Sequence, residues 1–145
     1  TGNLVQELSL KGYTSYCVSF SPNGKYLAYG SSDNYAHIYD LEKDQNYRSF
    51  KTMDDIHSVS FSPDGEYLAV GSNDDHAYVF NIDGGNEVNK FSTGKNVYSV
   101  TFTPDGKNLI AGLLGSIYVF RGFGVAAYTH TIYDLVVLVK FTTSL

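Results

Sequence analysis

The sequence repeats one seven-residue segment three times in a fixed register. Residues 18–24 read VSFSPNG, residues 59–65 read VSFSPDG and residues 100–106 read VTFTPDG. The segments begin at positions 18, 59 and 100, so the spacing is 41 residues in both steps. A period near 40 with strand-like content is typical of propeller blades, because a helical repeat of similar length would show a 3.6-residue apolar pattern. The repeat therefore predicts an all-β chain built from similar units.

Each unit is expected to contain four short strands. In the first unit, apolar residues alternate over 16–20, and a Pro-Asn-Gly turn follows. Proline presets the backbone of a tight turn, and glycine supplies the left-handed residue that a hairpin requires. The continuous apolar run 26–30 suits a strand buried on both faces, a third strand ends at Tyr39, and the polar stretch 46–51 suits an outer strand. The other two units show the same order.

The repeat divides the chain into nearly complete and partial blades. We expect the outer strand of a preceding blade in residues 1–10, blades over 13–51, 54–92 and 95–130, and the start of a further blade in 131–145. These units predict a partial ring of about three and a half four-stranded antiparallel blades. A blade does not bury its faces alone, and closed propellers use about four to eight blades. We therefore expect a fragment, or a chain completed by other blades. The fold of residues 122–138, which interrupt the repeat, is not assigned.

The repeated motifs resemble those of the WD40 repeat family. Residues 30–33 read GSSD and residues 38–40 read IYD, where the family has a Gly-Ser-x-Asp turn and a closing Trp-Asp pair. Residues 71–74 (GSND) and 79–81 (VFN) match more loosely. The resemblance covers roughly residues 3–121. It implies a WD40-like β-propeller with a face of loops that docks other proteins.

The chain departs from the family pattern at three places. Lys11, Thr52 and Thr93 stand where the family has a Gly-His pair, and the sequence contains no Trp. Residues 112–115 read GLLG where a turn Asp is expected. The buried Asp-His-Ser-Trp hydrogen-bond network of the family is therefore not expected here. Apolar packing is expected to hold the blades together instead.

Charge and composition exclude several classes of protein. A formal net charge of -5 with scattered basic residues argues against nucleic-acid or anionic-membrane binding, because both need clustered Lys and Arg. The longest apolar run, residues 135–139, is too short for a membrane span. Cys17 is the single cysteine, so no intrachain disulfide forms. We expect a cytoplasmic location, with the nucleus as an alternative.

No combination of residues in the sequence indicates catalysis, a metal or a cofactor. Asp33, Asp74 and Asp75 fall in tight turns, where carboxylates commonly accept backbone N–H groups. His57 is expected to be wedged between blades near a rim, and Cys17 to be a small side chain of the channel or core. No nucleophile beside an oriented base and no Gly-rich phosphate loop is evident. We therefore expect no enzyme activity and no cofactor.

The loops that join successive blades, and the turns in the middle of each blade, are expected to gather on one face at the mouth of the propeller channel. Tyrosine and methionine side chains suit protein contacts, and the acidic bias of these loops favours a basic protein or peptide partner. The residues predicted for this partner-binding face are Tyr13, Asp33, Asn34, Tyr35, Met53, Asp54, Asp55, Asp74, Asp75, His76, Lys95 and Asn96. The predicted function is a non-catalytic scaffold for protein–protein interaction.

Two other functions stay open from the sequence. One is a structural half-propeller that is completed by a second copy, as a homodimer, or by a longer parent chain. The other is a metal-dependent propeller hydrolase, in which Asp and His side chains at the channel mouth would hold a cation. The sequence names neither the partner nor the total number of blades.

Overall fold

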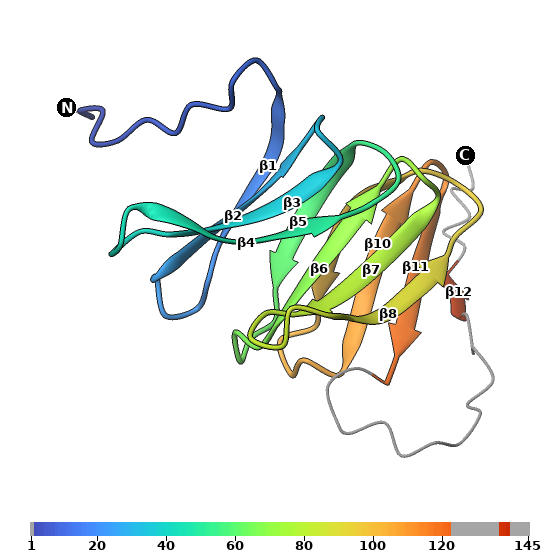
Figure 1. Cartoon of the computed structure of the whole chain (residues 1–145). Helices are drawn as coiled ribbons and strands as arrows, with labels where there is room; N and C mark the ends of the chain where they lie inside the picture. The colour runs from blue at the N-terminus through green and yellow to red at the C-terminus, as the bar shows by residue number, and fades with distance from the viewer. Residues whose placement is uncertain (1, 123–136, 140–145) are drawn as a thin grey trace.

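The computed structural model describes residues 2–122 and 137–139. These residues form twelve strands in three four-stranded antiparallel sheets (Figure 1). The described part of the chain contains no helix, and hence none long and apolar enough to cross a membrane. The all-β prediction is confirmed.

Consecutive strands pair in every sheet, and we call the three sheets blades 1, 2 and 3. Blade 1 contains β1 (Ser15–Phe20), β2 (Tyr26–Ser31), β3 (Tyr35–Asp40) and β4 (Gln45–Lys51). Blade 2 contains β5 (Ile56–Phe61), β6 (Tyr67–Ser72), β7 (His76–Asn81) and β8 (Glu87–Ser92). Blade 3 contains β9 (Val97–Phe102), β10 (Asn108–Leu113), β11 (Ser116–Arg121) and β12 (Val137–Val139).

A tight turn joins the first two strands of every blade. In blade 1, the Ser21 N–H donates to Tyr26 O and the Gly24 N–H donates to Ser21 O, both at 2.9 Å. Gly24 has a φ of 71°, a left-handed conformation that glycine adopts without steric cost. The equivalent Gly65 and Gly106 have φ values of 76° and 71°. The repeated Pro-x-Gly segment therefore forms a hairpin turn in all three blades.

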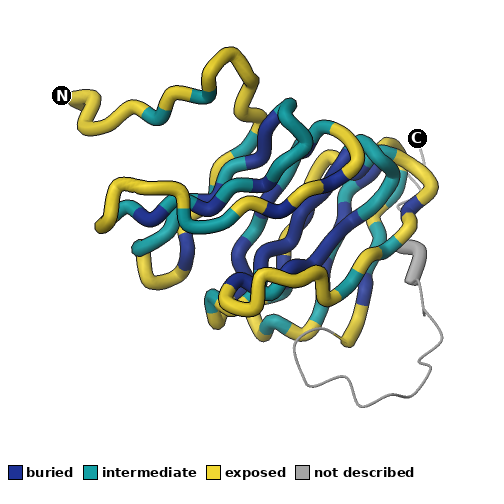
Figure 2. Tube along the Cα trace, viewed as in Figure 1, coloured by how far each residue is buried: buried dark blue, intermediate teal, exposed yellow. Residues whose placement is uncertain are grey.

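Apolar cores fill the two junctions between blades. The first strands of the blades are neighbours, with β5 between β1 and β9. Ile38 and Leu68 belong to the core between blades 1 and 2, and Val79 and Leu109 to the core between blades 2 and 3. Figure 2 shows that buried residues gather on the strands of the blades, whereas the N-terminal segment is mostly exposed. Each such side chain stabilises the fold by about 1.5–3 kcal/mol when buried.

An aromatic pair lies across each junction. Phe50 on β4 stacks on Phe80 on β7 with ring centroids 4.5 Å apart, and Phe91 on β8 stacks on Phe120 on β11 at 4.3 Å. The two pairs occupy equivalent positions of the repeat.

Each blade has two faces, one toward the preceding blade and one toward the following blade. We call the face toward the preceding blade the leading face and the face toward the following blade the trailing face.

The structure differs from the sequence prediction at both ends of the chain. Residues 2–10 form no strand, although the sequence predicts an outer strand in 1–10. None of the described strands pairs with them in a ladder, and a strand without a paired neighbour leaves its backbone N–H and C=O groups outside any ladder. Val137–Val139 pairs with β11 and so completes blade 3, whereas the sequence predicts the start of a further blade in 131–145. The rest of that range, and residues 123–130, lie outside the described residues.

Candidate partner-binding face

Loops that enter the blades and turns within them meet at one end of the structure. The Thr52 N–H donates to Asn34 O, and the Asn73 N–H donates to Asp55 O, both at 2.9 Å. Residues 52–55 form the entry loop of blade 2, which leads into β5. The first bond joins this loop to the turn between β2 and β3, and the second joins it to the turn between β6 and β7. We call this end the loop face and define it as residues 32–34, 52–55, 73–75, 93–96 and 114–115.

The structure places most of the predicted partner-binding residues on the loop face. The nine that lie there are Asp33, Asn34, Met53, Asp54, Asp55, Asp74, Asp75, Lys95 and Asn96. Tyr35 and His76 are the first residues of β3 and β7, and Tyr13 lies in the segment before β1. Met53 is 75% exposed, and Tyr13, Asp54 and Lys95 are also exposed, whereas the others are half-buried.

Asp74 holds two loops and a strand together. Its Oδ2 accepts hydrogen bonds from the Met53 N–H at 2.9 Å and from the Tyr78 hydroxyl at 2.6 Å, and its Oδ1 accepts from the His76 N–H at 3.1 Å. Burial of the ring, together with the hydrogen bond to Asp74, raises the pKa of Tyr78, so this phenol stays a donor. Asp74 therefore stabilises its turn, as its sequence position predicts.

Two buried threonines occupy the positions at which the sequence lacks a Gly-His pair. Thr52 Oγ1 donates to Asp54 O at 2.8 Å, and Thr93 Oγ1 donates to Lys95 O at 2.6 Å. The Thr93 N–H also donates to Asp75 O at 2.9 Å. Buried polar groups need partners, and these hydroxyls supply them inside the entry loops of blades 2 and 3. A short side chain thus replaces part of the missing network.

A row of aromatic rings crosses the three blades beside the loop face. Tyr16 on β1, His57 on β5 and Tyr98 on β9 are equivalent, and each stands at an irregularity in the pairing of its strand. Such bulges turn a side chain away from the regular pleat. The His57 ring centroid lies 5.2 Å from that of Tyr16 and 5.5 Å from that of Tyr98. We call these three residues the aromatic row.

Polar contacts tie the aromatic row to the loop face. The Tyr16 hydroxyl donates to Asp55 Oδ2 at 3.2 Å, and this hydrogen bond is the main cause that raises the pKa of Tyr16. His57 Nε2 lies 2.7 Å from Asn73 Oδ1 in the turn of blade 2. Tyr16 and Tyr98 remain 44% and 50% exposed. Sequence analysis misses both tyrosines as surface residues, although their 41-residue register with His57 is visible in the sequence.

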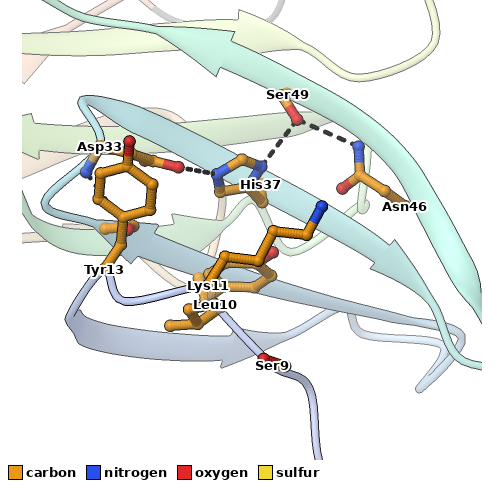
Figure 3. Close-up of a pocket in the computed structure, with 10 residues that line it drawn as sticks. Ser9, Leu10, Lys11, Tyr13, Asp33, His37, Asn46 and Ser49 are labelled. Atoms are coloured by element: carbon orange, nitrogen blue, oxygen red, sulfur yellow. Dashed lines mark hydrogen bonds and ion pairs between the residues drawn. The ribbon is translucent and has the colours of Figure 1, made fainter.

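A second polar cluster lies on the leading face of blade 1. His37 Nε2 lies 2.8 Å from Asp33 Oδ2, and His37 Nδ1 lies 2.8 Å from Ser49 Oγ (Figure 3). An ionised carboxylate only accepts hydrogen bonds, so Nε2 carries the hydrogen in the neutral ring and Nδ1 accepts from the Ser49 hydroxyl. The cluster borders a cavity of about 350 Å³ lined by Ser9, Leu10, Lys11, Tyr13, Tyr29, Ser31, Asp33, His37, Asn46 and Ser49.

Ser49, His37 and Asp33 are arranged like a nucleophile, a base beside it and a third group that orients the base. The sequence analysis finds no such combination. His37 and Ser49 are cross-strand partners in the β3–β4 register, so a search of paired strands would have found them. In blade 2, the equivalent Asp74 also bonds to the third strand, through Tyr78. A link from the turn to the third strand is thus a shared structural element of blades 1 and 2.

The carboxylates of the loop face do not converge on one point. Asp33 Oδ1 accepts from the Tyr35 N–H at 3.0 Å, and Asp54 Oδ1 accepts from the Asp55 N–H at 2.8 Å, so these oxygens serve their own loops. Within residues 2–122 and 137–139, no group of three or more His, Cys, Asp and Glu side chains is placed to hold a metal ion.

Comparison with solved structures shows the same fold. The β-propeller domain of Cps50 (Swd1) from Myceliophteria thermophila superposes with a TM-score of 0.74 at 21% sequence identity. The match covers 86% of the present chain and 38% of that chain. The present chain thus corresponds to well under half of that propeller structure. No curated protein sequence matches the chain.

Comparison with protein families assigns the repeats. The family described as "WD domain, G-beta repeat" (WD40) matches residues 3–40, 45–81 and 85–121. These segments cover more than half of the sequence. The second and third segments each combine the outer strand of one blade, β4 or β8, with the first three strands of the next blade. The chain therefore belongs to the WD40 repeat family and forms part of a β-propeller.

Proposed function

We propose that the chain is a non-catalytic scaffold whose loop face and aromatic row bind a basic segment of a protein partner. WD40 propellers generally serve as protein-interaction scaffolds, which supports the general class of function. The observation that carries the specific proposal is the contact between Tyr16 and Asp55, which places a partly exposed aromatic ring beside a carboxylate.

The charge of the loop face favours a basic partner. It carries five aspartates and a single lysine: Asp33, Asp54, Asp55, Asp74, Asp75 and Lys95. An Arg or Lys side chain over an aromatic ring gains about 0.5–2 kcal/mol, depending on how far it is desolvated. Nearby carboxylates add attraction that guides a cation toward the rings. Tyr16 and Tyr98 supply such rings, and exposed Met53 supplies adaptable apolar contact.

A basic peptide tests this proposal directly. The probe is a fluorescein-labelled peptide of alternating Arg and Gly, compared by fluorescence anisotropy with a peptide that has Glu in place of Arg. The Arg peptide should bind, and the Glu peptide should not. Tyr98→Ala should weaken binding about two- to thirty-fold, the loss expected when one cation–π contact is removed. Asp54→Asn should also weaken binding of the Arg peptide. This effect should be larger at low salt than at high salt, because dissolved ions screen exposed charges.

A matched control separates the loop face from charge in general. Asp64 lies in the turn between β5 and β6, and its Oδ1 accepts from the Ser62 hydroxyl and the Glu66 N–H. Asn23 makes the same two contacts in blade 1, so Asp64→Asn removes a charge without removing the turn. Asp64→Asn should leave peptide affinity unchanged. Equal effects of Asp64→Asn and Asp54→Asn, or wild-type affinity in Tyr98→Ala, would reject the proposed face.

The non-catalytic part of the proposal has its own test. If Ser49 were a nucleophile, purified protein would hydrolyse an activated ester and Ser49→Ala would abolish that turnover. We expect no turnover above that of free histidine, and no change in peptide binding in Ser49→Ala. Turnover that disappears with Ser49→Ala would show that the protein is an enzyme.

A further inference from the structure

The turn between β1 and β2 carries an amide where the equivalent turns carry a carboxylate. Blade 1 has Asn23 followed by Gly24, whereas blades 2 and 3 have Asp64 and Asp105, each followed by a glycine. The sequence contains no other asparagine followed by glycine. Asn23 and Gly24 are both exposed to solvent. Blade 1 therefore presents a side-chain amide at a position where an acid also fits.

The side-chain oxygen makes the contacts that hold this turn. Asn23 Oδ1 accepts hydrogen bonds from the Ser21 hydroxyl at 2.7 Å and from the Lys25 N–H at 3.0 Å. Asp64 Oδ1 and Asp105 Oδ1 each accept the same two kinds of hydrogen bond in their own turns. These bonds use one oxygen of the side chain. Replacement of the Asn23 NH₂ group by a carboxylate oxygen should therefore preserve them.

An asparagine that precedes glycine can react with its own backbone, because glycine has no Cβ to obstruct the approach of its nitrogen. The Gly24 nitrogen attacks Asn23 Cγ and closes a succinimide ring. The bond between Cγ and Nδ2 breaks, and Nδ2 leaves as ammonia with the proton that the Gly24 nitrogen loses. Water then opens the ring at either carbonyl and gives an aspartate or an isoaspartate. The net reaction is hydrolysis of an amide to an acid and ammonia, so no oxidant or reductant is needed.

The contacts of the turn act on this reaction in two ways. Negative charge develops on Asn23 Oδ1 during the attack, and the two donors already directed at that oxygen stabilise such charge. The Gly24 N–H, however, donates to Ser21 O at 2.9 Å, and this hydrogen bond has to open before the nitrogen reaches Cγ. An exposed turn opens at a lower free-energy cost than a buried strand. We therefore expect conversion in the folded protein at a rate that opening of the turn limits.

We infer that Asn23 is a site of spontaneous deamidation and that its aspartate product keeps blade 1 intact. The aspartate form repeats the side-chain contacts found in the turns of blades 2 and 3. The isoaspartate form adds a carbon to the backbone of the turn and disturbs the hairpin, because strand register depends on loop length. The turn lies at the end of β2 opposite to the loop face. The inference thus goes beyond the proposed function and does not depend on it.

Mass spectrometry of aged protein tests the inference. Folded wild-type protein is incubated at mildly alkaline pH in water enriched in heavy oxygen, digested, and compared with unaged protein digested in the same way. The peptide that contains Asn23 should gain the mass of OH in place of NH₂ and carry the heavy isotope. Asn86 is an exposed asparagine between β7 and β8, followed by Glu87, and should show far less conversion. No conversion at Asn23, or equal conversion at Asn86, would overturn the inference.

Two variants locate the reaction and test its consequence. Asp64→Asn creates the same dipeptide in blade 2 and should acquire the mass gain there on ageing, so freshly purified variant serves the binding test above. Asn23→Asp is the product form and should match fresh wild type in circular dichroism and thermal unfolding. A clearly lower unfolding temperature for Asn23→Asp would overturn the inference that aspartate keeps blade 1 intact.

Discussion

The rings of Phe50 and Phe80 lie 4.5 Å apart between centroids and 12° from parallel, across the junction of blades 1 and 2. Phe50 comes from the outermost strand of one blade and Phe80 from the third strand of the next. Both rings are buried. The contact joins sheets that share no backbone ladder, so the packing of such side chains decides how firmly successive blades hold together.

Phe80→Ala should destabilise the protein by about 3–5 kcal/mol, the range for removing a large side chain from a packed core. Tyr39→Ala, at the equivalent position on the open leading face, should cost less than half as much. Urea unfolding followed by circular dichroism at low protein concentration measures both. Equal losses would mean that the open face is already covered under those conditions.

Glycines on the second strands should differ in their tolerance of alanine. A Cβ at Gly30 would collide with Ile56 of blade 2, and a Cβ at Gly71 would lie 2.8 Å from Val97 Cγ1 of blade 3. At Gly112 the nearest atom, Ser99 Cβ, is 3.4 Å away. Gly30→Ala and Gly71→Ala should each cost about 1–3 kcal/mol through overpacking. Gly112→Ala should be near neutral in thermal unfolding, and a loss as large as that of Gly71→Ala would contradict this difference in packing.

The Cys17 thiol should react slowly. Burial raises the pKa of Cys17, although N–H groups of Gly30 and Val59 oppose the shift in part. The thiolate is the reactive form, so a raised pKa lowers its fraction at neutral pH. The rate of reaction with Ellman's reagent should fall below that of free cysteine at pH 7.5 and rise only at higher pH. Unfolding in guanidinium should restore the ordinary rate, and fast labelling of folded protein would contradict the half-buried position of Cys17.

Stability should decline in alkaline solution, in part through Tyr78. The pKa of Tyr78 is raised in the folded protein, whereas a tyrosine in the unfolded chain has the usual pKa of about 10. Above pH 10 the folded state therefore keeps a proton that the unfolded chain loses. The stabilisation is complete below that pH and decreases as the pH rises above it. Tyr78→Phe should cost roughly 1–3 kcal/mol at pH 7, because it removes the hydrogen bond to Asp74.

The pH dependence of that variant provides the check. Urea unfolding at pH 7 and at pH 10.5 should show a smaller alkaline loss for Tyr78→Phe than for the wild type, because the variant has no phenol at this position. Tyr16, Tyr29 and Tyr39 also have raised pKa values and contribute to the decline in both proteins. Parallel pH profiles would show that Tyr78 does not contribute.

The sequence predicts the repeating parts of the fold because their causes are local. The turn at Pro22 and Gly24 depends on the backbone preferences of those two residues. The alternation of Val18 and Phe20 needs only the period of a strand. The turn aspartate Asp74 acts on backbone groups within a few residues of it, and also on the more distant Met53 N–H. The local contact, with the His76 N–H, can be predicted from the sequence. The contact with the Met53 N–H of another loop cannot.

The candidate site depends on contacts between segments far apart in the chain. The aromatic row joins Tyr16, His57 and Tyr98 because three inner strands lie side by side and each carries a bulge at the same position. The cluster at His37 needs the register that places Ser49 opposite it. Neither bulges nor register can be read from apolar alternation alone, because a shift by one residue exchanges the two faces of a strand.

By itself, the sequence determined the blade as a unit, its length, its turns and its family, since each rests on residues within one 41-residue repeat. The tertiary structure decided which side chains are covered. Val18 and Val59 occupy the same place in nearly identical segments, yet one is 65% exposed and the other 6%. The difference lies in whether a neighbouring blade is present, and burial of an apolar side chain depends on what packs against it.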